Sequence, residues 1–333
     1  MKLAILGTGF IVQEGALKAL KDVPEIETVA IFALPRSRET AESLAKQNSI
    51  PKVFTDYDEL LADSEIEFVY IGLINSVHYE YTKRALLEGK NIIVEKPFAS
   101  TAAEVAELCE LAVQKNLYVF EAVTLLHLPN FNAIKNELPK IGRIRAVTAN
   151  YSQYSNRYDK YLRGEVLPVF DPQRSGGALY DINIYNVNLI VGLFGAPVEV
   201  NYMANIGFNG VDTSGILVMR YADFIATALG AKDSESPGFA LIQGEKGWIK
   251  VIGAPNELKS FEIYLRETGN VKKFELNRYD FRMVHEFKAF AQIYQAKDFD
   301  KMRNGLNISL AVLQTAETAR LGAGIKFPCD AAR

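Results

Sequence analysis

Asp181, Tyr185 and Asn188 are polar residues whose spacing would place them on one side of a helix. They lie in and just beyond the stretch SGGALYDINIYN, and side chains three or four positions apart are neighbours on a helix. Apolar residues surround them, and a tyrosine on a partly buried helix commonly packs with its hydroxyl satisfied. A positioned tyrosine can also transfer a proton to or from a reacting oxygen. Spacing alone favours the packing role, so the rest of the sequence must decide between the two.

A second group of residues lies where the first predicted strand (2–7) gives way to a predicted helix (10–23). Gly7, Thr8 and Gly9 occupy this junction, where glycine allows a tight turn and a close approach of the backbone to a pyrophosphate. The third position of the usual glycine pattern is Val12, which weakens the motif taken alone. Its place at the first strand-to-helix junction of an alternating domain nevertheless predicts dinucleotide binding.

The end of the next strand indicates which dinucleotide binds. An NAD site normally places Asp or Glu there to accept from the ribose 2′-hydroxyl, whereas this chain has Arg36, Ser37 and Arg38. Guanidinium groups suit a 2′-phosphate because they can bind it through two hydrogen bonds. Taken singly, each arginine could equally belong to a solvated basic helix start. Because the carboxylate is also absent, we predict NADP, with NAD as the alternative.

The order of elements predicts two domains. Nearly all-apolar strands that alternate with helices are typical of a parallel sheet covered on both faces, which predicts a Rossmann-type, doubly wound α/β domain over residues 1–122. Closely spaced strands with short connections then predict a mainly antiparallel sheet in residues 123–333. The predicted strands are 2–7, 28–34, 68–73, 91–95 and 118–123, then 143–155, 215–222, 224–231, 239–244, 247–253 and 261–267. The predicted helices are 10–23, 37–47, 78–89, 101–115, 280–296 and 302–322.

Composition excludes several classes of partner. The chain has 333 residues, of which 49% are apolar and 23% charged, with a formal net charge of −3. We therefore expect a globular protein with no nucleic-acid partner and no attraction to an anionic membrane. Two cysteines and three widely separated histidines predict neither a disulfide framework nor a metal site. Without a signal-peptide pattern or a membrane-spanning run, the expected location is the cytoplasm.

The stretch GKNIIVEKPFAS (89–100) carries a resemblance to a known family. With GTGFI (7–11) and GGALYDINIY (176–185), it resembles the glucose–fructose oxidoreductase, inositol dehydrogenase and rhizopine-catabolism oxidoreductases, here called Gfo/Idh/MocA. The resemblance covers essentially the whole chain. It implies a Rossmann domain, a second domain on a large mainly antiparallel sheet, NAD or NADP as cofactor, and hydride transfer at a sugar, polyol or related carbon. Tyr185, where many relatives have His, resembles the branch that contains dihydrodiol dehydrogenase.

The resemblance also implies catalytic residues, namely Lys96 of the E-K-P motif together with Asp181 and Tyr185. Hydride transfer at C–OH requires a proton to move at the oxygen. A free tyrosine has a pKa of about 10, and a nearby ammonium favours its phenolate. We therefore predict that Lys96 and Tyr185 flank the reacting oxygen while Asp181 orients the substrate or Lys96. In the family the Lys96–Pro97 bond is often cis.

Further residues are implied with less specific roles. Glu121 matches a family position near the cofactor, and a buried structural carboxylate is the alternative. A long loop (156–175) is expected to be mobile or to cover a site, and Tyr154 and Arg157 are candidates to contact the substrate. The predicted cofactor-binding residues are Gly7, Thr8, Gly9, Phe10, Ile11, Arg36, Arg38, Leu73, Asn75, His78, Glu95 and Lys96.

Two other functions remain open at this point. Some relatives bind the dinucleotide but act as regulators that recognise a protein partner, and others cleave glycosides through transient oxidation with tightly held NAD. Retention of both Lys96 and Tyr185 favours the dehydrogenase or reductase, because a pure sensor has no need of them. The resemblance also implies a homodimer formed through the open face of the second sheet, and a sugar-like small molecule as substrate.

Overall fold

The computed structural model describes residues 1–332 and divides into two compact units. The first unit consists of Met1–Ala122 together with Phe281–Ser309. The second consists of Val123–Asp280 and the residues from Leu310 onward. The expected fold class is confirmed, since the first unit holds a parallel sheet and the second a mainly antiparallel one.

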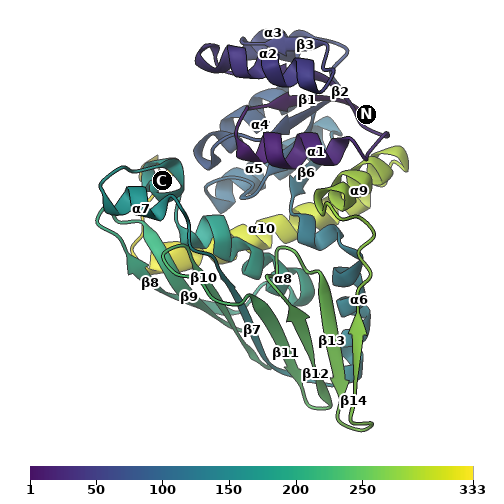
Figure 1. Cartoon of the computed structure of the whole chain (residues 1–333), viewed down its shortest axis with the longest axis vertical. Helices are drawn as coiled ribbons and strands as arrows, with labels where there is room; N and C mark the ends of the chain where they lie inside the picture. Colours follow the sequence, from purple (N-terminus) through teal and green to yellow (C-terminus); the bar gives the residue numbers. More distant parts are fainter. Residues whose placement is uncertain (333) are drawn as a thin grey trace. The chain divides into compact units, whose positions relative to one another are not determined.

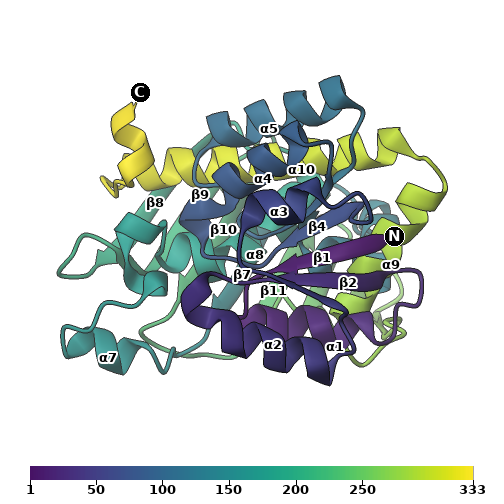
Figure 2. The same ribbon diagram turned by 90° about the horizontal axis from the view of Figure 1, so that it is seen from above.

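The first unit is a doubly wound parallel sheet of six strands in the order β3-β2-β1-β4-β5-β6. Helices α1 and α2 cover one face, and α4 and α5 cover the other (Figure 2). The strand order reverses between β1 and β4, and ligands of such sheets bind at this switch point, beyond the carboxyl ends of the strands. Its strands are β1 Lys2–Leu6, β2 Glu27–Phe32, β3 Lys52–Phe54, β4 Phe68–Ile71, β5 Asn91–Glu95 and β6 Val119–Ala122. Its helices include α1 Leu17–Leu20, α2 Arg38–Gln47, α3 Tyr57–Ala62, α4 His78–Leu87 and α5 Ala102–Lys115.

Helix α9 (Met283–Gln295) belongs to the first unit, whereas the sequence-based division at residue 122 leaves it in the second. The reason is its apolar face, which packs aromatic side chains on the parallel sheet. Phe287 lies 5.9 Å from the ring of Tyr70, and Phe290 stacks on Phe120 at 4.6 Å. Burying these aromatic rings on the parallel sheet places α9 in the first unit, although the residues before it, up to Asp280, belong to the second. The following helix, α10 (Phe299–Gly322), contributes residues up to Ser309 to this unit.

The second unit is built on eight strands in the order β14-β13-β12-β11-β7-β10-β9-β8 (Figure 1). All neighbours are antiparallel except β10 and β7, which run parallel. Helix α8 (Ile184–Phe194) packs on β7 and β10. The strands are β7 Ile144–Ser152, β8 Glu199–Ile206, β9 Asp212–Arg220, β10 Ile225–Ala231, β11 Phe239–Gly244, β12 Gly247–Ile252, β13 Ser260–Leu265 and β14 Asn270–Phe274. The remaining helices include α6 Pro129–Glu137 and α7 Tyr158–Leu162.

The segment 156–175, expected to be a long loop, folds around a small buried cluster that it shares with Val211. It contains α7 and two short 3-10 turns, Pro168–Phe170 and Pro172–Arg174. Tyr161 and Phe170 are buried here with their rings 5.1 Å apart, and the Tyr161 hydroxyl donates to Asn209 Oδ1 at 2.8 Å. Aromatic packing therefore supplies the order that the polar sequence does not suggest.

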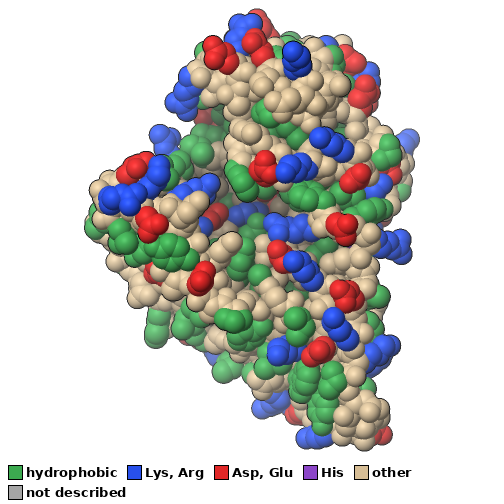
Figure 3. Space-filling view, viewed as in Figure 1, with side chains coloured by type: hydrophobic (Ala, Val, Ile, Leu, Met, Phe, Trp, Pro, Cys, Tyr) green, Lys and Arg blue, Asp and Glu red, His purple; other side chains and the backbone are tan. Residues whose placement is uncertain are grey.

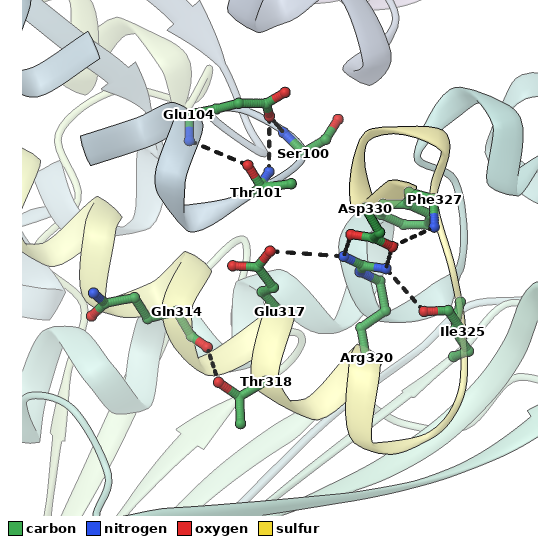
Figure 4. Close-up of polar contacts among 10 residues, drawn as sticks. All are labelled: Ser100, Thr101, Glu104, Gln314, Glu317, Thr318, Arg320, Ile325, Phe327 and Asp330. Atoms are coloured by element: carbon green, nitrogen blue, oxygen red, sulfur yellow. Dashed lines mark hydrogen bonds and ion pairs between the residues drawn. The ribbon is translucent and has the colours of Figure 1, made fainter. Parts of the chain in front are cut away.

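The chain beyond α10 is fastened to the second unit by a buried arginine (Figure 4). Arg320 is 1% exposed and donates to both carboxylate oxygens of Asp330, at 2.6 and 2.7 Å. It also donates to the Ile325 carbonyl at 2.9 Å, and its guanidinium lies 4.0 Å from the centre of the Phe327 ring. A buried charge of this kind is tolerated because a carboxylate pairs with it, here that of Asp330.

Within residues 1–332, no helix combines the length and apolar character needed to cross a membrane. The same residues contain no group of three or more His, Cys, Asp or Glu side chains arranged to hold a metal ion. On the face shown in Figure 3, basic and acidic side chains are interspersed, so that face presents no extended basic surface.

Candidate active site

The segment that runs from Ser175 into α8 leaves two polar side chains partly accessible and buries everything around them. From Ser175 to Gly192 every residue is buried except Asp181 and Tyr185. After a non-helical start, the segment continues as a π-helix (Leu179–Asn183) and then as α8. The predicted helix is thus confirmed. Asn188 differs from the expectation, because it is buried and its side-chain amide donates to the Ile184 carbonyl of its own helix at 2.9 Å.

The start of this helix is fixed by a buried carboxylate. Asp212 accepts from the Leu179 amide at 2.6 Å and from the Tyr202 hydroxyl at 2.7 Å. Burial raises the pKa of Asp212, opposed by these hydrogen bonds. Gly177 lies against the same carboxylate with a φ of +124°, where a Cβ would overlap Asp212 Oδ1. Only glycine allows the helix to begin this close to β9.

Two buried asparagines then fasten the helix to β10. Asn183 donates to the Ala228 carbonyl at 2.9 Å, and Asn186 donates to the Leu229 carbonyl at 2.8 Å. Gly230 permits this approach, because a Cβ there would overlap Asn183. The position and rotation of the helix are therefore set by paired buried polar groups, and Asp181 and Tyr185 are held in fixed places on its accessible side.

Asp181 and Tyr185 each have a neighbour that positions them within the second unit. Asp181 forms an ion pair with Lys232, whose side chain is 8% exposed. The ring of Tyr185 lies 5.8 Å from that of Tyr151 on β7. Lys232 was not among the predicted site residues, because it lies 51 positions from Asp181 and no motif surrounds it.

In the first unit, the E-K-P segment is likewise buried except at one ionisable residue. From Ile92 to Thr101 every residue is buried except Lys96, which follows β5 directly. The bond between Lys96 and Pro97 is cis. Lys96 is thus the one partly accessible side chain of a rigid, buried segment at the carboxyl end of a strand, where ligands of doubly wound sheets bind.

Three carboxylates hold the backbone around Lys96. Glu95 accepts from the Tyr70 hydroxyl at 2.7 Å and from the Lys96 amide at 3.3 Å. Glu121 accepts from the Phe98 amide at 2.9 Å. Glu104 accepts from the amides of residues 100 and 101 at 2.9 Å, which completes the capping box that starts α5 (Figure 4). Burial raises the pKa of Glu95, and raises that of Glu121 to about 7.

His78 supports this segment from the other side. It is fully buried, with Nδ1 2.8 Å from the Pro97 carbonyl oxygen and Nε2 3.0 Å from the Leu73 carbonyl oxygen. Burial lowers its pKa, against the opposing effect of the two carbonyls. Both ring nitrogens are therefore engaged with backbone, and any influence of His78 on a cofactor would pass through the loops at Leu73 and Pro97.

The glycine turn has the geometry of a dinucleotide site. Gly7 has a φ of +105°, and a Cβ there would lie 2.6 Å from the Gly72 carbonyl oxygen. Gly9 is exposed with open space around it, so a phosphate group could reach its backbone. Val12 departs from the usual pattern, but it packs closely against Gly72. A Cβ on Gly72 would lie only 2.7 Å from Val12 Cγ2. The residues present therefore suit a bound dinucleotide.

The two predicted phosphate-binding arginines differ in their surroundings. Arg36 is exposed in the short turn Pro35–Ser37 after β2, and it forms no ion pair with any residue the structure describes. Arg38 is also exposed, but its Nε donates to Glu42 at 2.8 Å one helical turn away. Arg36 is thus the better placed of the two to meet a 2′-phosphate.

The remaining predicted residues lie at various levels of exposure. Phe10 is 71% exposed at the start of the first helix, and Ile11, Leu73 and Asn75 are partly exposed. Tyr154 and Arg157 are exposed, and the Tyr154 hydroxyl donates to Asp159 at 2.7 Å. Lys96 and the predicted cofactor residues belong to the first unit. Asp181, Tyr185, Tyr154 and Arg157 belong to the second.

Comparison with known proteins assigns the family. Residues 1–123 match the model of the oxidoreductase family with an NAD-binding Rossmann fold, and residues 138–250 match the GFO/IDH/MocA C-terminal domain. The chain is 33% identical, over the whole of both proteins, to the NADP(+)-dependent scyllo-inositol 2-dehydrogenase IolU of Bacillus subtilis. It is 28% identical to the trans-1,2-dihydrobenzene-1,2-diol dehydrogenase of Xenopus tropicalis, over 78% of this chain and 76% of that protein.

Solved structures share the fold. A 3-ketoreductase from Actinomadura kijaniata in complex with NADP and TDP-benzene matches 97% of each chain with a TM-score of 0.84 at 21% identity. Levoglucosan dehydrogenase in complex with NADH and levoglucosan matches 97% of each chain with a TM-score of 0.82 at 17% identity. From the family models and the full-length relative together, this chain belongs to the Gfo/Idh/MocA family and is an NAD(P)-dependent oxidoreductase that acts on CH–OH groups.

Proposed function

We propose that the protein is an NADP-dependent dehydrogenase or reductase that transfers a hydride at a carbon of a sugar, polyol or related alcohol. A relative that is an NADP(+)-dependent inositol dehydrogenase supports this substrate class. The observation that carries the proposal is that both motif segments are buried except at Lys96, Asp181 and Tyr185. Ionisable side chains that alone remain accessible in otherwise buried segments are candidates for chemistry rather than packing.

In this proposal Lys96 and Tyr185 serve the reacting oxygen. A bound dinucleotide would supply or accept the hydride at its nicotinamide ring. In oxidation, the Tyr185 phenolate takes the proton of the substrate hydroxyl as the carbonyl forms, and in reduction the Tyr185 hydroxyl returns it. The Lys96 ammonium donates a hydrogen bond to the reacting oxygen. Asp181 accepts from a neighbouring substrate hydroxyl and so fixes which carbon reacts.

The role of Tyr185 is tested by Tyr185→Phe, with Tyr294→Phe on α9 as a matched control. General acid–base catalysis is worth about 10²–10⁴ in rate, so we expect kcat on a true substrate to fall at least about 100-fold in Tyr185→Phe and to stay unchanged in the control. NADPH affinity, followed by fluorescence titration, should be the same in all three proteins. If Tyr185→Phe keeps more than about a tenth of the turnover, the assignment is wrong.

The preference for NADP is proposed to depend on Arg36. Its guanidinium is exposed and unengaged after β2, where no carboxylate is available for a ribose 2′-hydroxyl. Fluorescence titration should show NADPH binding at least about tenfold more tightly than NADH. Arg36→Ala should remove most of this difference, about 1.4 kcal/mol or more. Arg38→Ala is the matched control, because Arg38 already pairs with Glu42. Equal affinities for the two dinucleotides in the wild type would contradict the proposal.

We further propose a homodimer formed through the face of the second sheet opposite α8. Neighbouring strands present apolar side chains on this face, with Met203 69%, Ile216 45% and Ile225 54% exposed. Such a row of exposed apolar side chains is typical of an interaction surface. Light scattering should give a dimer for the wild type and a monomer for Ile216→Lys. Leu162→Lys, at an apolar position on α7 that is 64% exposed, should remain dimeric, and a monomeric wild type would contradict the proposal.

A further inference from the structure

Lys232 is a buried cation beside the proposed site that the motifs do not include. It follows β10 directly, its side chain is 8% exposed, and its Nζ donates to Asp181 Oδ2. We propose that Lys232 is a positioning residue that holds Asp181 ionised and in one orientation toward the substrate. This inference rests on the proposed function, since it assigns a partner to one of the residues proposed there.

The pair is built into the fold rather than formed by chance at the surface. β10 is held between β7 and β9 along its whole length, and Asn183 and Asn186 bind two of its carbonyls. The same helix carries Asp181, so the position of Asp181 relative to the end of β10 is fixed. A long cation that is buried at such a point must find a carboxylate, because an unpaired ammonium there would be strongly unfavourable.

The carboxylate next to Lys232 along the chain is already engaged elsewhere. Asp233 accepts from the hydroxyls of Thr213 and Ser214, both at 2.7 Å, and from that of Ser234 at 3.0 Å. Among residues 1–332, Asp181 is therefore the one carboxylate within ion-pair distance of the Lys232 ammonium. Lys232 therefore pairs with Asp181 on the helix that also carries Tyr185, and not with Asp233, its neighbour in the chain.

The backbone of Lys232 also connects the strand to a second candidate region. Its amide donates to the Thr213 carbonyl at 2.9 Å, and its carbonyl accepts from the Ser155 amide at 2.9 Å. Ser155 lies between Tyr154 and Arg157, the predicted substrate contacts. The main chain at Lys232 is thus hydrogen-bonded to β9 and to the loop at Ser155. A substitution of the Lys232 side chain leaves these backbone hydrogen bonds intact.

An ion pair of this kind decides what Asp181 can do. An adjacent ammonium favours the ionised carboxylate, and an ionised carboxylate only accepts hydrogen bonds. Asp181 would then recognise a substrate hydroxyl and would not compete with Tyr185 for the proton. The side chain of Asp181 is 32% exposed while that of Lys232 is 8% exposed, so Asp181 is the more accessible member of the pair.

A double-mutant cycle on kcat/KM tests the inference, using wild type, Lys232→Met, Asp181→Asn and the double variant. Contacting residues that act through one another give non-additive effects. We expect Lys232→Met to lower kcat/KM about 10- to 100-fold in the wild-type background and less than about threefold in the Asp181→Asn background. Lys232→Arg should restore most of the activity, since it keeps the charge. Lys301→Met, an exposed lysine on α10, should change nothing.

The outcomes separate this inference from the proposed function. NADPH titration gives the number of folded sites, so a variant that only loses folded protein is recognised by its lower binding capacity and unchanged KM. An active wild type in which Lys232→Met keeps its kcat/KM, or loses the same factor with and without Asp181, overturns the inference alone. A wild type that binds NADPH but oxidises or reduces no sugar or polyol overturns the proposed function and this inference with it.

Discussion

Replacing Glu121 by Gln should change how the stability of the protein depends on pH. Glu121 is buried, and its carboxylate accepts from the Phe98 amide at 2.9 Å, two residues beyond Lys96. Burial raises its pKa to about 7, opposed by hydrogen bonds from Ser309 and the Phe98 amide. The nearby carboxylate of Glu95 raises it further, because two buried negative charges repel each other. Gln keeps an acceptor for the amide and does not titrate.

The sign and size of the effect follow from proton linkage. The ordinary pKa of a glutamate is 4.5, so between about pH 4.5 and 7 the folded state binds more protons at this site than the unfolded state. The stability that this site contributes is present below about pH 4.5 and is lost as the pH rises to about 7. A shift of about 2.5 units corresponds to about 3 kcal/mol. Relative to Glu121→Gln, the wild type should therefore lose up to about 3 kcal/mol between pH 5 and 8.

The measurement is urea unfolding followed by far-ultraviolet circular dichroism at intervals from pH 5 to 8, for both proteins without ligand. The difference between the two free energies of unfolding reports on Glu121 and on its interaction with Glu95, because the remaining titrating groups are common to both proteins. The constant offset from exchanging an acid for an amide drops out of the slope. A difference that is flat over this range, or a wild type that gains stability on the variant as the pH rises, would refute the reasoning.

Three further substitutions test the site and its support. Lys96→Ala should lower kcat at least about 100-fold on a true substrate, and a loss below about tenfold (about 1.4 kcal/mol) would count against its role at the reacting oxygen. Gly177→Ala should lower the free energy of unfolding in urea by about 2–5 kcal/mol, because of its positive φ and a steric overlap with Asp212. Gly210→Ala is the control, since it has a positive φ but open space around it, and it should cost clearly less. Equal losses of stability in the two variants would show that the overlap does not contribute. Asp330→Ala should cost about 3–5 kcal/mol, because it leaves the guanidinium of Arg320 buried without its carboxylate; an unchanged thermal midpoint would show that the ion pair is not needed.

Much of the fold could be predicted from local sequence patterns. Apolar runs alternating with helices specify a parallel sheet because both faces of its strands are buried, and the glycines at 7 and 9 mark the first turn. The helix that carries Asp181 and Tyr185 was predictable from its spacing. The strands that were missed are β3, which has only three residues, and β8 and β14, which lie at the edge of their sheet with mostly exposed side chains. Without a buried face, an edge strand leaves little apolar pattern in the sequence.

The sequence by itself determined the chemistry-bearing residues through their motifs, since Lys96, Asp181 and Tyr185 lie in short segments whose spacing can be read directly. Only the tertiary structure decided that these side chains alone stay accessible in buried segments, that α9 joins the parallel sheet, and that Lys232 pairs with Asp181. The physical reason is the range of the interactions. Helices, turns and strand periodicity depend on residues a few positions apart, whereas burial and the pairing of a buried charge depend on which distant segments pack together.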